Sequence, residues 1–280
     1  MDQARKTISG HCRVDAVGKV FGSADSGPEI VLKNCSFEVP AGSLTVLLGP
    51  SGCGKSTLVQ LVAGYDTPTL GNVTLDGVSV TGPGTDRIVV FQETALFPWM
   101  TLLDNVAYGP IQMGIPRREA ESEASALLRD VGLKAFEDRY PSQISGGMQR
   151  RAEVARALIA RPKLMLLDEP FRGLDHMSRG LMQEYYLKLF DQHQTTTLFV
   201  TSEIDEAIFL ADRLVILSYK PTTVQTVIDV PLPRPRDFQM LTSSVYGQIK
   251  EQALDLLYNE ALKAFDQPAI PANGGVRGTA

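Results

Sequence analysis

Cysteine and histidine are both scarce in this chain of 280 residues, and neither follows a metal-binding pattern. These residues are Cys12, Cys35, Cys53, His11, His176 and His193. The wide spacing and odd number of the cysteines argue against a disulfide framework and favour a reducing compartment such as the cytoplasm. The scattered histidines argue against a metal site built on histidine.

Long apolar runs and a positive net charge are also missing. No run reaches the roughly 18 apolar residues of a membrane-spanning helix, so no such helix is expected. Residues 1–10, MDQARKTISG, are polar and do not predict a secretory signal. The formal net charge of −5 argues against nucleic acid as a main partner, because a phosphate backbone is bound by a basic surface.

Short apolar segments do occur, and they alternate with helical patterns, which predicts an α/β fold with a parallel sheet. Buried strands are expected at residues 44–48, 164–167, 197–200 and 214–217. Residues 29–40 instead alternate with period two, and short strand-like pieces follow within 72–91. These segments predict an additional antiparallel β subdomain.

Helical patterns dominate the middle of the chain. Apolar residues recur at helical spacing over 101–160, so an inserted α-helical subdomain is expected at about 93–160. The main domain is predicted over 1–240, and a C-terminal extension over 241–280 contains one amphipathic helix at 247–265. That helix either forms a contact between subunits or covers the sheet.

A glycine-rich loop follows the first buried strand and opens a helix. Its sequence GPSGCGKST matches the phosphate-binding pattern G-x-x-x-x-G-K-[ST] in the context that the pattern requires. The residues of this loop are Gly49, Pro50, Ser51, Gly52, Cys53, Gly54, Lys55, Ser56 and Thr57. Its backbone N–H groups and the helix N-terminus favour an anion, so ATP with Mg²⁺ is the predicted ligand. Lys55 is expected on the β- and γ-phosphates, Ser56 on Mg²⁺ and Thr57 on the α-phosphate.

Cys53 in this loop has two interpretations. The helix N-terminus would favour a reactive thiolate at this position. Alternatively, the thiol simply occupies a variable position of the loop.

Two carboxylates end a second buried strand, in the sequence LMLLDEP. The carboxyl ends of parallel strands form the ligand-binding edge of such a sheet. Asp168 is therefore predicted to hold Mg²⁺, mostly through water, and Glu169 to orient and deprotonate the attacking water. The alternative is that Glu169 only caps the next segment.

Three further motifs lie in a fixed order around these two. They are Gln92 within VFQETALFPW, Ser145–Gln149 within QISGGMQRRAEVARAL, and FRGLD at 171–175. Together with the phosphate loop they resemble the ATPase subunits of ABC transporters, over roughly residues 12–217. The resemblance implies a P-loop NTPase (RecA-like) core that hydrolyses ATP.

The resemblance also assigns residues to the nucleotide. Gln92 would contact Mg²⁺ and the attacking water, and Phe21 would stack on adenine. Ser145 and Gly147 start a helix and would bind the ATP of a second, identical or related, ATPase subunit, with Asp175 also at that dimer interface. Two alternatives stay open from the residues alone: Phe21 as a core aromatic, and Ser145 as a plain helix cap.

Partners follow from the same resemblance. Phe97, Pro98 and Trp99 would receive the coupling helix of a transmembrane permease, unless they belong to the core of the helical subdomain. The stretch GPGTDRIVVFQETALFPW and the later RPRD are similar to the branch that imports nitrate, sulfonates, taurine or bicarbonate. That branch implies a periplasmic binding protein as an indirect partner, and a location on the inner face of the bacterial plasma membrane.

The segment VTSEIDEA at 200–207 departs from the family pattern. Most ABC ATPases carry a γ-phosphate-sensing histidine where this chain has Ser202, and neither His176 nor His193 replaces it in register. Ser202 would cap the following helix through its hydroxyl, and would reach the phosphate only through a water. Hydrolysis driven by Glu169 is the first hypothesis, and an ATP-dependent dimerisation switch with little hydrolysis is the alternative.

Overall fold

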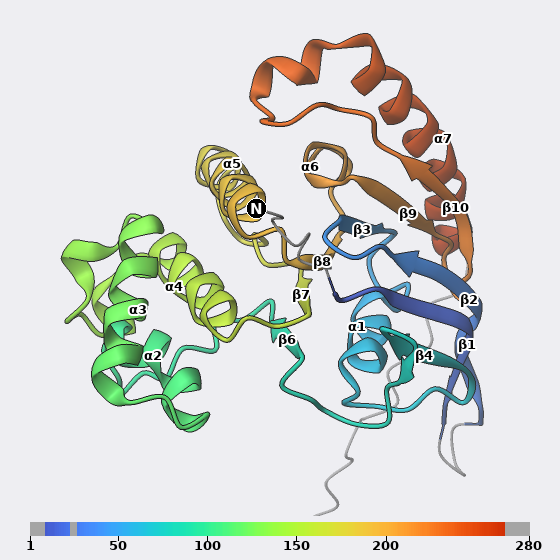
Figure 1. The fold of residues 1–280 in the computed structure, drawn as a ribbon. Coiled ribbons are helices and arrows are strands. Elements are labelled where there is room, and N and C mark those ends of the chain that lie inside the picture. Colours follow the sequence, from blue (N-terminus) through green and yellow to red (C-terminus); the bar gives the residue numbers. More distant parts are fainter. Residues whose placement is uncertain (1–8, 23–26, 267–280) are drawn as a thin grey trace, which may run out of the picture.

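The structure is a computed structural model that describes residues 9–22 and 27–266. Its described part contains two β-sheets, with a block of helices standing to one side of them (Figure 1). The predictions for the polar N-terminus at 1–8 and for the tail at 267–280 lie outside the described residues.

The larger sheet has the strand order β10-β9-β3-β8-β7-β6. These strands are β3 (Leu44–Leu48), β6 (Arg87–Val90), β7 (Leu164–Asp168), β8 (Thr196–Thr201), β9 (Arg213–Leu217) and β10 (Val224–Asp229). Every pair in it is parallel except β9 with β10. Strands β3 and β8 are buried along their whole length, as expected for the centre of a parallel sheet.

The parallel sheet predicted from the apolar segments is therefore confirmed, but its edge strand β10 was missed. Strand β10 alternates half-buried and exposed residues and contains Gln225 and Thr226. Such an edge strand lacks the continuous apolar run by which the central strands are recognised.

The smaller sheet is antiparallel, with the order β2-β1-β4-β5, as its period-two pattern predicted. Its strands are β1 (Cys12–Phe21), β2 (Glu29–Val39), β4 (Leu70–Leu75) and β5 (Val78–Ser79). One face of it packs on helix α1 (Lys55–Ala63) and on the larger sheet, in a cluster that includes Val14, Phe37 and Leu58.

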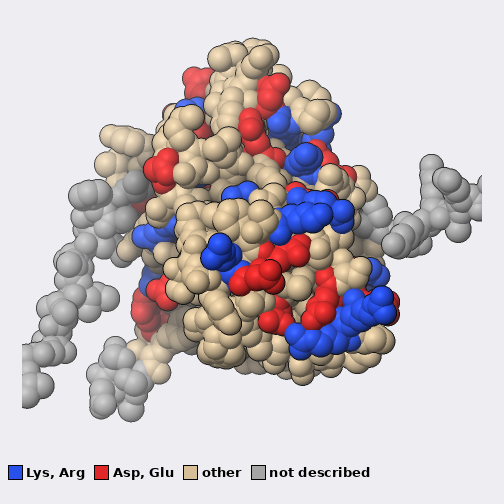
Figure 2. Space-filling view, turned by 90° about the vertical axis from the view of Figure 1, so that its left-hand side faces the viewer, with Lys and Arg blue, Asp and Glu red and all other residues tan. Residues whose placement is uncertain are grey.

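The inserted helices α2 (Leu102–Gln112), α3 (Arg117–Asp130) and α4 (Gly146–Ile159) form the block beside β6 (Figure 1). Short 3₁₀ helices at Lys134–Phe136 and Pro141–Gln143 connect α3 to α4. Figure 2 shows the face on this side, where acidic and basic side chains lie next to one another. Ion pairs such as Arg117 with Glu121, at 2.6 Å, join charges of opposite sign on these helices.

The remaining helices cover the larger sheet. They are α5 (His176–His193), α6 (Ile204–Leu210) and α7 (Ser244–Asp266), with a 3₁₀ helix at Phe238–Thr242 before α7. No helix in the described ranges is both long and apolar enough to cross a membrane.

The C-terminal helix α7 is held against helix α6 and strand β9. The Tyr246 hydroxyl donates to Asp205 Oδ1 at 2.5 Å, and Lys250 Nζ lies 2.7 Å from the same oxygen. Buried Ile249 and Ala253 join the main core. Of the two roles considered for this helix, covering the sheet is therefore observed within this chain.

Candidate functional site

Four loops meet at the carboxyl edge of the parallel sheet because β3, β8, β7 and β6 are consecutive neighbours. The glycine-rich loop follows β3, Asp168 is the last residue of β7, and Glu169 comes directly after it. Ser202 follows β8, and Gln92 follows β6. The strand order thus brings together residues that are far apart in the sequence, as expected for the ligand edge of an α/β sheet.

The glycine-rich loop has the backbone that a phosphate cradle requires. Gly52 and Gly54 have φ of +78° and +101°, a region that favours glycine. A Cβ on Gly54 would also lie 2.9 Å from a methyl carbon of Val31, whereas a Cβ on Gly52 would meet no atom of the described residues within 4 Å. The predicted helix start at Lys55 and its end at Gly64 are both observed.

A cavity of about 390 Å³ opens over this loop. It is lined by Phe21, Glu29, Val31, Ser51, Gly52, Gly54, Lys55, Ser56, Thr57, Gln92, Glu169, Arg172 and Lys220. The structure therefore brings most of the predicted phosphate-loop residues together with Gln92, Glu169 and Phe21. We call this space the phosphate cavity.

Lys55 lies at the floor of the phosphate cavity and is only 5% exposed. Its Nζ donates to the carbonyl oxygens of Gly49 at 2.9 Å and Pro50 at 3.0 Å. Glu169 Oε1 lies 3.5 Å from the same nitrogen. The ammonium is thus already placed among oxygen atoms, as a phosphate-binding cation would be.

Glu169 forms an ion pair with a second cation through its other carboxylate oxygen. Arg172 Nη1 lies 3.1 Å from Glu169 Oε2, so the carboxylate bridges Lys55 and Arg172. The backbone of Glu169 has φ +44°, an uncommon value for a residue with a side chain, and its N–H donates to Val200 O. This backbone turn directs the carboxylate over the loop, and strained conformations of this kind are frequent at functional sites.

The surroundings of Asp168 show whether the site fits a divalent cation. Its Oδ1 is buried and has no hydrogen-bond partner among the described residues. Burial raises the pKa of Asp168; the Ser56 hydroxyl and Lys55 oppose this rise, and the charge of Glu169 adds to it. An orphaned carboxylate oxygen beside a serine hydroxyl provides the hard oxygen ligands that Mg²⁺ prefers, so these residues fit the ion.

The segment that carries Gln92 is tied to helix α4. Arg150, in α4, donates to the carbonyl oxygens of Phe91 at 2.6 Å and Gln92 at 2.5 Å. Its partner Glu153 accepts the Ala95 N–H at 2.5 Å. Gln92 itself is exposed and lines the phosphate cavity, so the Arg150 contacts join α4 to the edge of this cavity.

Burial decides two of the alternatives that the sequence leaves open. Phe21 is 40% exposed and lines the phosphate cavity, with Lys19 Nζ at 5.1 Å from its ring, so the core interpretation is wrong. Cys53 is fully buried, and this burial raises the pKa of its thiol. The reactive-thiolate interpretation is therefore wrong, and Cys53 is a packed residue of the loop.

Ser145, Gly147 and Asp175 lie apart from the phosphate cavity. Ser145 caps α4 by accepting the Met148 N–H at 3.3 Å, and Asp175 caps α5 by accepting the Ser178 N–H at 3.0 Å. A Cβ on Gly147 would meet no atom of the described chain within 4 Å, which shows an open surface at this helix start. In this single chain, Ser145 and Asp175 act as caps.

Ser202 does not cap the helix that follows it, contrary to the prediction. Helix α6 begins after Glu203, and the Glu203 N–H is accepted by the Thr201 hydroxyl at 3.0 Å. Among the described residues no side chain caps this helix, because the Thr201 contact lies in the turn between strand β8 and the helix, and Ser202 is exposed. Ser202 instead lines a second cavity of about 250 Å³, together with Ser51, Glu169, Phe171, Arg172, Arg179, Thr201, Glu203 and Glu206. We call this space the switch cavity.

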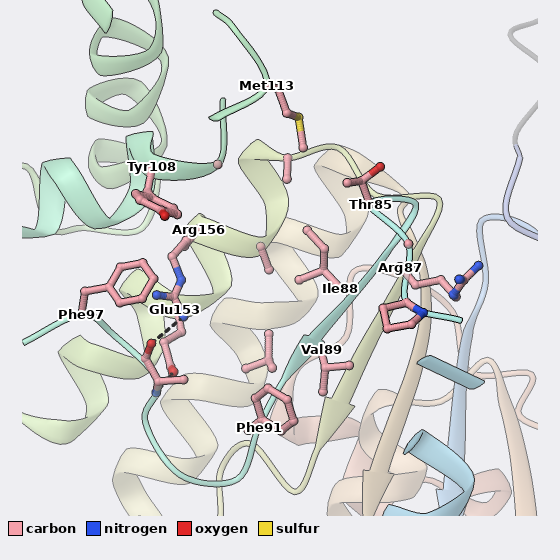
Figure 3. A pocket seen from close by; sticks show the side chains of 17 residues that line it. Thr85, Arg87, Ile88, Val89, Phe91, Phe97, Tyr108, Met113, Glu153 and Arg156 are labelled. Atoms are coloured by element: carbon pink, nitrogen blue, oxygen red, sulfur yellow. Dashed lines mark hydrogen bonds between the residues drawn. The ribbon is translucent and has the colours of Figure 1, made fainter. Parts of the chain in front are cut away.

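A third cavity, of about 490 Å³, lies between β6 and the helical block (Figure 3). Ile88, Val89 and Phe91 form its strand side, and Tyr108 and Met113 close it from α2. Most of its lining is apolar. We call it the helical groove.

Phe97, Pro98 and Trp99 stand at one end of this groove, and Phe97 is part of its lining. Phe97 is half-buried, with Tyr108 at 5.0 Å and Trp99 at 5.5 Å between ring centroids, and Arg156 lies 5.2 Å above its ring. Trp99 is 70% exposed, and Pro98 is exposed as well. The alternative that these residues are core is therefore wrong for Pro98 and Trp99.

Sequence reasoning missed three charged residues of the phosphate cavity, Glu29, Arg172 and Lys220. Lys220 pairs with Glu29 at 2.8 Å across segments 191 positions apart. No local pattern marks either residue, because the pair arises only when β2 and the loop after β9 meet. Arg172 could have been predicted from the sequence, since it follows Glu169 by three positions, in the FRGLD motif.

Comparisons with known proteins agree on one family. The model described as ABC transporter matches residues 32–172. The chain is 43% identical to the bicarbonate transport ATP-binding protein CmpD of Synechocystis, over 88% of each protein. It is 41% identical to the nitrate import ATP-binding protein NrtD of the same organism, over 80% of this chain and 84% of the relative. A dimeric ATP-binding cassette bound to ADP and phosphate superposes with a TM-score of 0.66, at 26% identity over 79% of this chain and all of that one.

Proposed function

We propose, from the premise that this chain belongs to the ABC transporter family, that it is the ATP-hydrolysing subunit of an importer for a small oxyanion. The single observation that carries the proposal is the convergence of Lys55, Gln92, Asp168 and Glu169 at one sheet edge. Residues from two separate strand ends, those of β6 and β7, and from the start of helix α1 meet there around a phosphate cradle.

The proposed reaction is ATP hydrolysis. The water oxygen bonds to the γ-phosphorus while the bond from that phosphorus to the β–γ bridging oxygen breaks. The electron pair of the broken bond stays on ADP, and Glu169 accepts the proton of the water. Lys55 and the loop N–H groups hold the β- and γ-phosphates, and Thr57 faces the α-phosphate.

Mg²⁺ would be held by the Ser56 hydroxyl, by Asp168 mostly through water, and by Gln92. When bound, it neutralises phosphate charge and orients the phosphates for displacement. Phe21 offers its exposed ring to the adenine face, next to the cavity.

We further propose that two copies of the chain, or this chain and a related one, close over two ATP molecules. The open helix start at Ser145 and Gly147 does not line the phosphate cavity of its own chain. An N-terminus with free N–H groups favours an anion, so the partner's γ-phosphate is its ligand, with Asp175 near that interface. The dimer of the ADP-bound relative supports this arrangement.

The helical groove is the proposed docking site for a transmembrane permease. It is apolar, and half-buried Phe97 and exposed Trp99 stand at its end, a composition typical of the energetic centre of an interface. The Arg150 and Glu153 contacts with residues 91–95 connect this groove to Gln92. A helix seated here can therefore sense the state of the nucleotide.

The solute is proposed to be nitrate or bicarbonate, with sulfonates or taurine as further candidates, because the relatives named above import bicarbonate and nitrate. A periplasmic binding protein would select it, so this chain makes no contact with the solute. The chain is then peripheral on the cytoplasmic face of the plasma membrane, attached through the permease.

The experiment has two parts. Mg²⁺-dependent ATPase activity is measured for the purified chain and for Lys55→Ala, and solute uptake is measured in cells before and after deletion of the gene. We expect the Lys55 variant to lose activity, and uptake of labelled nitrate or bicarbonate to fall on deletion. An active Lys55 variant would contradict the site, and unchanged uptake of every candidate oxyanion would contradict the transport role.

The alternative of a dimerisation switch with little hydrolysis is not favoured. Glu169 lies at the phosphate cavity, and the relatives at 41–43% identity are import ATP-binding subunits.

A further inference from the structure

We propose that Arg172 is a catalytic residue that binds the terminal phosphoryl group of ATP together with Lys55. This inference rests on the proposed ATPase function and deepens it. It starts from the boundary between the phosphate cavity and the switch cavity, which share Ser51, Glu169 and Arg172 among their lining residues. Arg172 is thus a cation that faces both spaces.

The spacing of the two cations fits a single small anion. The Glu169 carboxylate lies 3.5 Å from Lys55 Nζ through Oε1 and 3.1 Å from Arg172 Nη1 through Oε2. One carboxylate therefore bridges the two side chains. A phosphoryl group presents its oxygens at a similar separation, and guanidinium groups bind carboxylate and phosphate in the same forked geometry.

Arg172 is also free to move to the phosphate. Its side chain is 59% exposed, and Glu169 is its only ion-pair partner in the described part of the chain. Solvent weakens this ion pair on the exposed Arg172 side, so the multiply charged phosphates of ATP can bind the guanidinium in place of Glu169. The exchange also releases Glu169 to accept a proton from water.

The other cations nearby are less well placed. Lys220 lines the phosphate cavity but not the switch cavity, and it pairs with Glu29 at 2.8 Å. Of these two cavities, Arg179 lines the switch cavity alone, and it pairs with Glu203 at 3.3 Å. Among the described residues, Arg172 is thus the one cation that lines both cavities.

The chemistry explains why such a cation is useful here. Charge spreads over the γ-phosphoryl oxygens in the transition state, and an arginine supplied by the same chain can stabilise it. Ser202 faces the switch cavity with a hydroxyl that stays neutral near pH 7, so it provides no positive charge there. Arg172 lines the same cavity and provides that charge.

The test compares Arg172→Ala, Arg172→Lys and the control Arg118→Ala in the full-length chain. Arg118 is an exposed arginine of α3, outside both cavities. We expect kcat of Arg172→Ala to fall about 10²-fold with KM for ATP nearly unchanged, because the contact strengthens in the transition state. Arg172→Lys keeps a charge and should retain more activity, and Arg118→Ala should match the wild type.

A second readout separates catalysis from structure. Trapping by ADP with orthovanadate, which mimics the transferring phosphoryl group, should weaken in Arg172→Ala while the melting temperature stays unchanged. A wild-type kcat in Arg172→Ala, or undiminished vanadate trapping, would overturn the inference. The proposed ATPase function is judged separately in the same assay. If Glu169→Gln abolishes hydrolysis, that function is retained even where Arg172→Ala has no effect. If the wild type does not hydrolyse ATP, the proposed function itself fails.

Discussion

Replacing Glu169 with glutamine should lower the rate of hydrolysis and at the same time raise the affinity for ATP. The amide keeps the shape of the side chain but removes its charge and its ability to take a proton. Loss of a general base costs about 10²- to 10⁴-fold in rate, so kcat should fall within that range.

The gain in affinity follows from the contact between Glu169 and Lys55. Both side chains are largely buried, and Oε1 lies 3.5 Å from Nζ, so the carboxylate competes with the phosphates for the ammonium. An exposed ion pair contributes about 0.2–1 kcal/mol, and loss of one partner of a buried pair costs about 3–5 kcal/mol, so about 1.5 kcal/mol is a reasonable value for this largely buried but long contact. Removing about 1.5 kcal/mol of competition should lower the Kd for ATP about tenfold.

The assay is a fluorescence or calorimetric titration with ATP, paired with steady-state phosphate release. Glu119→Gln, the same change at an exposed position of α3, is the matched control and should alter neither quantity. A Glu169 variant that hydrolyses ATP at the wild-type rate would refute the general-base assignment. An unchanged or higher Kd would refute the reasoning about competition for Lys55.

Three further predictions concern the other parts of the machinery. Ser202→His should raise kcat about tenfold and make the rate depend on pH between about pH 5 and 8, where imidazole titrates. The measurement is the ATPase rate as a function of pH, and a flat profile with no gain in kcat would contradict the prediction. Because burial raises the pKa of Asp168, protons should compete with Mg²⁺ at a higher pH than at an exposed aspartate. The Mg²⁺ concentration for half-maximal ATPase activity should therefore rise as the pH falls, and a requirement independent of pH would count against Asp168 as a ligand. Trp99→Ala should weaken binding to permease-containing membranes about 30-fold in co-sedimentation, with Tyr258→Ala on α7 as the exposed aromatic control, and equal binding by both variants would remove Trp99 from the docking surface.

Local patterns were enough for the elements that carry the phosphate chemistry. The apolar run 44–48, the glycine loop and the helix from Lys55 to Ala63 appear where they were predicted. Glycine conformations and helix starts depend on neighbouring residues in the chain, so the sequence alone specifies them. The same applies to the carboxylates at the end of β7.

Helix capping at residue 202 shows where local reasoning failed. Both Thr201 and Ser202 carry a hydroxyl, and the pattern S-E-I-D favoured the serine. In the structure neither hydroxyl caps the helix. Strand β8 continues through Thr201, whose hydroxyl accepts the Glu203 N–H in the turn before the helix, and Ser202 lines the switch cavity. The outcome depended on where the buried strand ends and where the helix begins, which the hydroxyl pattern does not encode.

By itself, the sequence determined which functional groups are present: a phosphate loop, two carboxylates at a strand end and a neutral residue at position 202. Only the tertiary structure decided which groups share a space. The order β3-β8-β7-β6 places Glu169 beside Lys55, and the meeting of β2 with the loop after β9 pairs Glu29 with Lys220. Such contacts depend on how distant segments pack, because burial and strand order, rather than neighbours in the chain, set the distances between their side chains.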